Sequence, residues 1–126
     1  MRAVDRIFAI ATVPLIIAMF VDGANAAGDP AKGELIFAKC ASCHTKDKSN
    51  RTGPGLLGVA GRQAGSVQGF HYSRAMKAAN VVWDDKSLDA FIAAPQKAVP
   101  GTVMPFAGLP DQQQRTDLIA YLETLK

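Results

Sequence analysis

Apolar residues recur at intervals of three and four in two stretches of the chain, a spacing that predicts amphipathic helices. The first stripe consists of Leu88, Phe91 and Ile92, and the second of Leu118, Tyr121, Leu122 and Leu125. Asp84 or Asp85 is placed to cap the first helix, which Pro95 should stop. Asp111, with Gln114 three residues later, resembles a capping box for the second.

Two further helices are expected nearer the N-terminus. Asp29 and Pro30 have the residue types of an N-cap and a first helical position, and this helix should continue through Phe37 towards Cys40. Ser73 could cap a short helix that reaches about Ala79. Residues 45–70 and 95–110 are rich in glycine or proline and are expected to be loops. Because no alternating strand pattern appears, the predicted fold is all-α, with four to five helices joined by long loops.

The first 26 residues differ in character from the rest of the chain. Arg2 and Arg6 precede an uncharged, mostly apolar run over residues 7–21, and Ala24-Asn25-Ala26 follows with a small-x-small pattern. This order is typical of a secretory signal peptide, so we expect cleavage after Ala26 and a single domain over residues 27–126. The alternative is an uncleaved anchor, for which the apolar run is shorter than the roughly 20 residues that a spanning helix needs.

Composition and charge narrow the class of protein further. The net charge of +3 and pI of 9.0 suit an exported protein that meets acidic partners. The basic residues are too few and too scattered to indicate nucleic-acid binding. Two cysteines cannot form a disulfide scaffold, and a domain of this size often needs a disulfide, a metal or a cofactor to supplement its core.

The two cysteines and a histidine form one motif, Cys40-Ala41-Ser42-Cys43-His44, which has the C-x-x-C-H spacing of c-type haem attachment. On a helical turn, residues three apart share a face, so both thiols can reach the two vinyl groups of one porphyrin. The adjacent imidazole can then approach the iron. The alternatives are a thioredoxin-like redox disulfide, which needs strands that this sequence does not offer, and a zinc site, which usually needs four ligands.

The residues alone leave three candidates for a sixth iron ligand. Met104 lies in a proline-bracketed loop away from any helical stripe, whereas Met76 lies in a predicted short helix, where methionine is usually core. His71 is the third candidate. The stiff loop favours Met104, and His/Met ligation suits a one-electron carrier with a comparatively high reduction potential.

Residues 28–126 resemble class I cytochromes c, most closely the soluble bacterial cytochrome c2 and c550 type, which is similar to mitochondrial cytochrome c. The matching stretches are Phe37–His44, Gly53–Leu56 with Gly61-Arg62, Phe70–Ser73, Val82-Trp83, Pro95, Pro100–Gly108 and Asp117–Leu122. The resemblance implies a cytochrome c fold wrapped around one covalently bound haem c. It also implies that the first helix packs across the last.

The resemblance also assigns roles to residues around the cofactor. It implies thioether bonds at Cys40 and Cys43, axial ligation by His44 and Met104, and a hydrogen bond from His44 to the carbonyl of Pro54. The residues that it places near the haem propionates are Arg62, Tyr72 and Trp83, with help from Thr102.

The chain departs from the mitochondrial pattern at three positions near the cofactor. Phe91 stands in place of a tyrosine and Met76 in place of a common asparagine, so the pocket is expected to be drier. Val103 replaces a lysine of the docking surface, which leaves partner preference open.

The implied function is that of a periplasmic one-electron carrier and not an enzyme. Its partners would be redox proteins with acidic docking surfaces, such as a cytochrome bc1-type donor and an oxidase, reductase or reaction-centre acceptor. The protein is expected to be a monomer that is peripheral to the membrane and binds no nucleic acid. The alternative from another class is a haem enzyme or gas sensor in which Met104 is labile.

Overall fold

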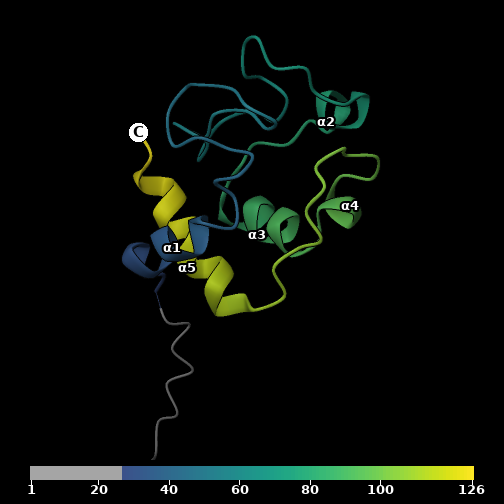
Figure 1. Ribbon diagram of the computed structural model, residues 1–126. Coiled ribbons are helices and arrows are strands. Elements are labelled where there is room, and N and C mark those ends of the chain that lie inside the picture. Colours follow the sequence, from purple (N-terminus) through teal and green to yellow (C-terminus); the bar gives the residue numbers. More distant parts are fainter. Residues whose placement is uncertain (1–26) are drawn as a thin grey trace, which may run out of the picture.

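A computed structural model describes residues 27–126, so the predicted signal peptide, residues 1–26, lies outside the described residues. The elements are α1 (Pro30–Phe37), α2 (Arg74–Ala78), α3 (Asp85–Ala93), α4 (Pro95–Ala98) and α5 (Gln112–Thr124) (Figure 1). In this part of the chain the β-type pairing is limited to one isolated bridge between Gln63 and Val82. The all-α prediction is therefore confirmed. None of the helices within residues 27–126 is long and apolar enough to span a bilayer.

Side-chain caps start four of the helices at the predicted places. The Asp29 carboxylate accepts hydrogen bonds from backbone N–H groups in the first turn of α1, and the Ser73 hydroxyl accepts one in α2. Asp84, rather than Asp85, caps α3, and its carboxylate and the Ser87 hydroxyl form a reciprocal capping box. At α5 the carboxylate of Asp111 caps the helix by accepting from a backbone N–H, as its position predicts.

The expectation that residues 95–110 form only loop is wrong at its beginning. Pro95 ends α3, as predicted, but it is also the first residue of the four-residue helix α4. A proline suits this position because its missing N–H would have no helical partner there. The rest of the segment, from Val99 to Pro110, contains no helix or strand.

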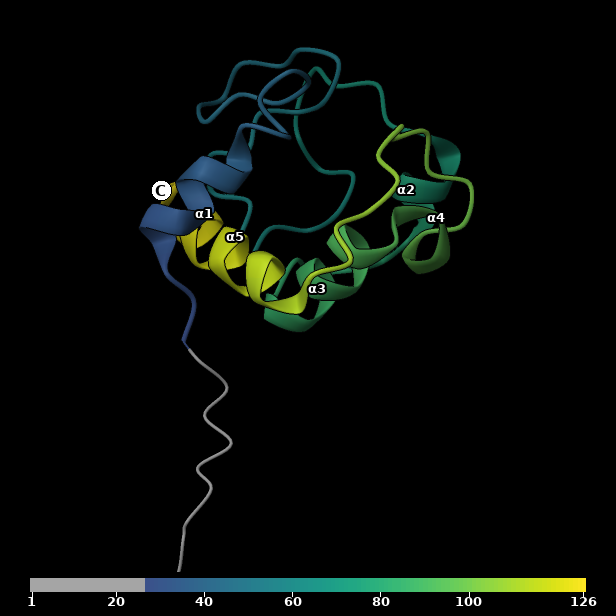
Figure 2. The ribbon, with the colours of Figure 1, turned by 60° about the horizontal axis from the view of Figure 1, so that its bottom comes forward.

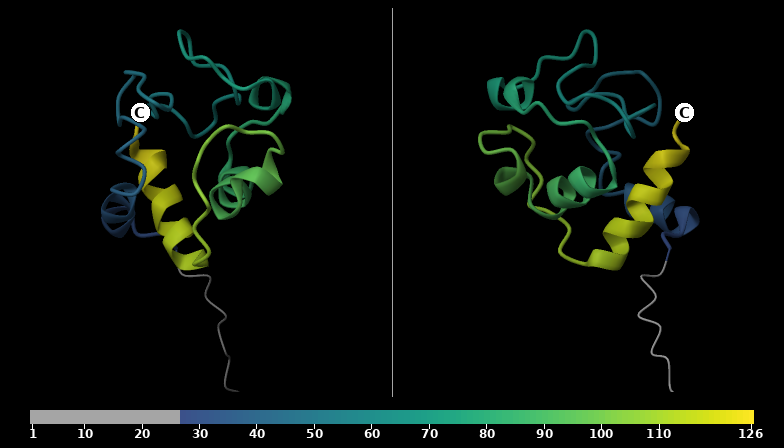
Figure 3. Two further views of the ribbon diagram at one scale, coloured as in Figure 1. Left: turned by 45° about the vertical axis from the view of Figure 1, so that its right-hand side comes forward. Right: turned by 180° about the vertical axis from the view of Figure 1, so that it is seen from behind.

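Helix α1 packs across α5 through a position without a side chain. A β-carbon at Gly33 would overlap the backbone carbonyl oxygen of Asp117, and it would lie 2.7 Å from the β-carbon of Tyr121. Beside this contact, the rings of Phe37 and Tyr121 meet with centroids 5.4 Å apart. The close approach of the two helices is visible in Figure 2 and from both sides in Figure 3. It agrees with the packing of the first helix across the last that the resemblance implies.

A buried carboxylate strengthens the same junction. Asp117 Oδ1 accepts hydrogen bonds from the backbone N–H of Asp29 (2.9 Å) and from Nε2 of Gln113 (3.0 Å). These bonds, that from Asp29 foremost, hold the pKa of the Asp117 carboxyl below its ordinary value of 3.8. The ionised carboxylate therefore links the start of α1 to α5.

Acid should weaken this link. A carboxyl whose pKa is lowered by folding stabilises the fold while it is ionised, and this contribution is lost as the pH falls through the folded-state pKa. We expect the free energy of unfolding to fall less steeply below pH 4 in Asp117→Asn than in the unsubstituted holoprotein. Urea unfolding between neutral and acid pH measures the two slopes. Parallel curves would mean that Asp117 contributes nothing to acid sensitivity.

The remaining elements close a ring around the centre of the domain. α3 packs against both α5 and α4, while α2 lies near α4 on the side away from α1 (Figure 2). The long loop over residues 45–72 forms the rest of the ring (Figure 1). The core residues Leu88, Leu118 and Leu122 all line the central pocket, so the same side chains form the core and the site.

Candidate functional site

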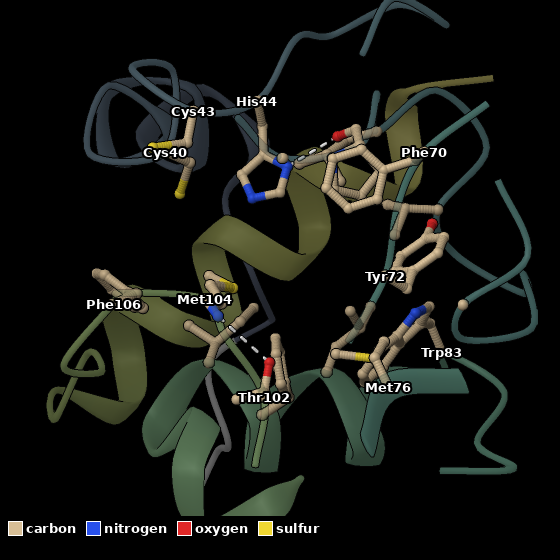
Figure 4. Close-up of a pocket in the computed structure, with 18 of the residues that line it drawn as sticks. Cys40, Cys43, His44, Phe70, Tyr72, Met76, Trp83, Thr102, Met104 and Phe106 are labelled. Atoms are coloured by element: carbon tan, nitrogen blue, oxygen red, sulfur yellow. Dashed lines mark hydrogen bonds between the residues drawn. The ribbon is translucent and has the colours of Figure 1, made fainter. Parts of the chain in front are cut away.

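The centre of the domain contains a mostly apolar cavity of about 350 Å³. Its walls come from the turn after α1, the 52–72 loop, α2, α3, the 102–106 loop and α5 (Figure 4). The predicted site residues that line it are Cys40, Cys43, His44, Pro54, Arg62, Tyr72, Trp83, Thr102 and Met104. The structure therefore gathers all nine predicted residues, which span 65 positions of sequence, around one cavity.

The motif residues share one wall because the chain continues α1 as turns. The backbone N–H groups of Cys43 and His44 both donate to the carbonyl of Cys40, at 3.0 and 2.9 Å. Both thiols are free, and burial raises the pKa of the Cys40 thiol. The described residues contain no sheet that a thioredoxin-like fold would need, and no cluster of three or more potential metal-binding side chains of the His, Cys, Asp and Glu types. The redox-disulfide and zinc alternatives therefore find no support there.

The orientation of the His44 ring follows from one hydrogen bond. Nδ1 lies 2.8 Å from the carbonyl oxygen of Pro54. Because that oxygen can only accept, Nδ1 donates, and the lone pair of a neutral imidazole is then on Nε2. Burial lowers the pKa of His44 and so favours the neutral ring. A β-carbon at Gly53 would overlap this ring, so the glycine lets the 52–54 loop cradle the imidazole.

Met104 and His44 reach the pocket from opposite sides. In Figure 4 the thioether of Met104 lies across the pocket from the imidazole, whereas Met76 lies beside Trp83. Met76 is a buried residue of α2 that also lines the cavity. His71, the third ligand candidate, is exposed and is not among the lining residues. The structure thus places one of the three candidates opposite His44.

The four residues expected near the propionates are all in the wall, and the side chains of Arg62, Tyr72 and Thr102 form hydrogen bonds with the backbone. The Arg62 guanidinium donates to the carbonyls of Leu57 (3.0 Å) and Gly55 (3.2 Å), and burial lowers its pKa. The Tyr72 oxygen accepts from the N–H of Val67 (3.2 Å), which leaves its own proton available to donate.

The other two residues of this group differ in their surroundings. Trp83 is buried, and its ring meets that of Phe91 with centroids 5.0 Å apart. The hydroxyl of Thr102 accepts a long hydrogen bond of 3.4 Å from the N–H of Met104. Phe91 and Met76 both line the cavity, where they add apolar surface.

Gly53 and Phe70 line the cavity, and neither was given a role by the sequence. Gly53 shapes the His44 cradle, and Phe70 packs edge-on against Tyr72 with ring centroids 4.8 Å apart. Gly53 was noted only as the first residue of the Gly53–Leu56 stretch that carries the resemblance. No periodic pattern could show Phe70, because the loop has no regular repeat from which the direction of a side chain follows.

The chemistry of these residues fits a covalently attached haem. The cavity offers apolar walls for the macrocycle, and two thiols one helical turn apart for the vinyl groups. It also offers a neutral imidazole with a free nitrogen and an opposed soft sulfur for the iron. A fold of five helices around such a site defines a class I cytochrome c.

Comparison with known proteins agrees with this class. The family model described as cytochrome c matches residues 30–126. The chain is 48% identical to cytochrome c of Euglena viridis over 101 residues, which cover 79% of this chain and 99% of that protein. It is 47% identical to cytochrome c2 of Rhodoblastus acidophilus, covering 79% of this chain and 95% of that protein. Among solved structures, cytochrome cH from Methylobacterium extorquens matches with a TM-score of 0.75 and 45% identity, covering 77% of this chain and 99% of that one.

The chain belongs to the cytochrome c family. Members of this family carry covalently attached haem c and transfer electrons, and Cys40 and Cys43 provide the attachment motif in this chain. The predictions of family, fold class and cofactor are therefore confirmed.

Proposed function

We propose that this chain is a diffusible periplasmic one-electron carrier with His44 and Met104 as the axial ligands of its haem. Residues 1–26 would be a signal peptide removed after Ala26, and residues 27–126 the haem-binding domain. The observation that carries the proposal is the placement of His44 and Met104 on opposite sides of one cavity whose wall also holds both motif cysteines.

The bound haem would accept and return one electron, and the surrounding residues would set its reduction potential. The carbonyl of Pro54 keeps the proton of His44 on Nδ1 and the ring in one orientation. The thioether of Met104 would favour the ferrous state. The apolar walls, which include Phe91 and Met76, exclude water and so disfavour a net charge in the pocket.

The residues near the propionates would hold the polar edge of the cofactor. Tyr72 has an O–H proton to donate, and the Arg62 guanidinium lies in the same wall with its position fixed by two carbonyls. Trp83 and Thr102 would add further donors. Their common role would be to compensate the desolvation of buried carboxylates.

Docking would depend on exposed lysines that attract acidic surfaces of membrane redox complexes. The candidates are Lys39, Lys46, Lys77, Lys86 and Lys97, all of which are exposed. Lys46 pairs with Glu34 at 3.2 Å, and Lys86 lines a separate groove between α3 and α5, so these two are weaker candidates. The partners would be a donor of the cytochrome bc1 type and an oxidase, reductase or reaction centre as acceptor. Each would present an acidic docking surface to these lysines. A monomer suits this role because the surface around the cofactor edge stays open.

Carbon monoxide distinguishes this carrier from a haem enzyme or gas sensor, since the gas binds ferrous haem that has an open axial position. We expect the reduced holoprotein to show no spectral change under carbon monoxide at neutral pH. Met104→Ala should bind the gas readily, and Met76→Ala should behave as the unsubstituted protein does. Binding to the unsubstituted protein would favour the sensor or enzyme and contradict ligation by Met104.

A further inference from the structure

One side chain of α4 reaches the loop that presents Met104. Nε2 of Gln96 donates a hydrogen bond of 2.6 Å to the carbonyl oxygen of Thr102, two residues before Met104. Thr102 is also held by its own N–H, which donates to the carbonyl of Val99 (3.0 Å). Together the two bonds fasten residue 102 to the helix behind it.

The two hydrogen bonds at Thr102 matter because the segment that follows, residues 103–108, forms few hydrogen bonds of its own. Among the hydrogen bonds of the described chain, segment 103–108 makes only the 3.4 Å bond from the N–H of Met104 to the Thr102 hydroxyl. The next strong bond is from the N–H of Leu109 to the carbonyl of Ile92 (2.9 Å). Met104 therefore lies much closer to the Thr102 end of this span than to the Leu109 end.

The helix that carries Gln96, α4, is anchored in the core at its first residue. Pro95 is among the most completely buried residues, and the N–H of Val99 donates to its carbonyl at 2.9 Å. Gln96 itself is an exposed residue and does not line the cavity, so its side chain acts on the loop and not on the pocket.

We propose that Gln96 is a positioning residue that keeps Met104 in the axial site. Its side chain does so by donating a hydrogen bond to the Thr102 carbonyl, which holds the start of the Met104 loop against α4. The inference rests on the proposed ligation by Met104. Any departure of Met104 from the iron requires the 103–108 segment to move, and the Gln96 bond restrains the end of that segment nearer to the ligand. Removing the donor should therefore speed the opening of the loop.

The rate of this opening can be measured with imidazole as the probe. Imidazole can bind the ferric iron of the holoprotein only after Met104 has left, so the binding rate at saturating imidazole reports the opening step. Gln96→Met keeps the length of the side chain without a donor, and Gln96→Glu keeps its shape but is ionised at neutral pH. We expect both variants to raise the limiting rate by about five-fold, as loss of one hydrogen bond allows.

The matched control is Gln68→Met, because Gln68 is exposed on the distant loop. It should leave the limiting rate unchanged. In every variant, the ring-current-shifted methyl signal of the ligated methionine in the reduced protein should persist, which shows that the fold and the bond remain. If Gln96 only stabilises α4, its replacement would lower the free energy of unfolding without changing the limiting rate.

The outcomes separate this inference from the proposed function. If the unsubstituted protein shows a Met104 methyl signal but both Gln96 variants open at its rate, the positioning role is overturned and the ligation stands. If the unsubstituted protein lacks that signal and binds imidazole with no limiting rate, ligation by Met104 is overturned and the positioning role with it.

Discussion

Leucine in place of Met104 will lower the reduction potential of the holoprotein by on the order of 0.1 V or more, given that axial-ligand identity spans about 0.8 V among haem proteins. The thioether is a soft donor that stabilises ferrous iron, and leucine has no atom that can replace it. Water could then enter the opened position, and it would favour the ferric state further. A potentiometric titration of the purified holoproteins measures the change.

Met76→Leu is the matched control for this experiment. Met76 is buried, lines the same cavity and loses the same sulfur, but it lies beside Trp83 rather than opposite His44. Its potential should remain close to that of the unsubstituted protein. An equal fall in both variants would show that the potential responds to pocket packing and not to a ligand at residue 104.

Alanine at Gly33 will destabilise the fold by about 3 kcal/mol, at the upper end of the usual cost of overpacking. The new β-carbon would overlap the backbone carbonyl oxygen of Asp117, and backbone cannot rotate away as a flexible side chain can. Helices α1 and α5 would therefore have to separate. The higher helix propensity of alanine offsets only about 1 kcal/mol of this cost. Urea unfolding of the reduced holoprotein measures the difference.

Leu35→Ala provides the control on the same helix. Leu35 is 78% exposed, so its truncation should change the free energy of unfolding by less than about 0.5 kcal/mol. If Gly33→Ala also changes stability by less than about 1 kcal/mol, the close crossing of α1 and α5 does not depend on the missing side chain.

Local chemistry explains why much of the helical framework could be predicted. The caps at Asp29, Ser73 and Asp111 act within three residues of their partners, so the sequence contains both ends of each interaction. Helix α4 was missed because Pro95 is equally suited to end one helix and to begin another. Only the packing of the neighbouring segments decides whether a new turn follows.

The site likewise combines residues that are neighbours in the sequence with residues that only the fold brings together. Cys40, Cys43 and His44 are neighbours on one turn, and their spacing alone identified the cofactor. The proline-bracketed loop favoured Met104 over Met76 and His71 as a ligand, and the resemblance implied the same residue. Its position opposite His44, however, depends on the course of a loop without regular structure, which no periodic pattern specifies. The contributions of Gly53 and Gln96 could not be predicted, because each acts through a contact with another segment that no periodic pattern specifies.

Methyl-labelled methionine offers the most direct test of ligation by His44 and Met104. In the proton–carbon NMR spectrum of the reduced holoprotein, the methyl group bound at the iron should be displaced far upfield by the ring current of the porphyrin. We predict one such signal, which disappears in Met104→Leu and persists in Met76→Leu. A displaced signal that survives the loss of Met104, or no displaced signal in the unsubstituted protein, would contradict the account.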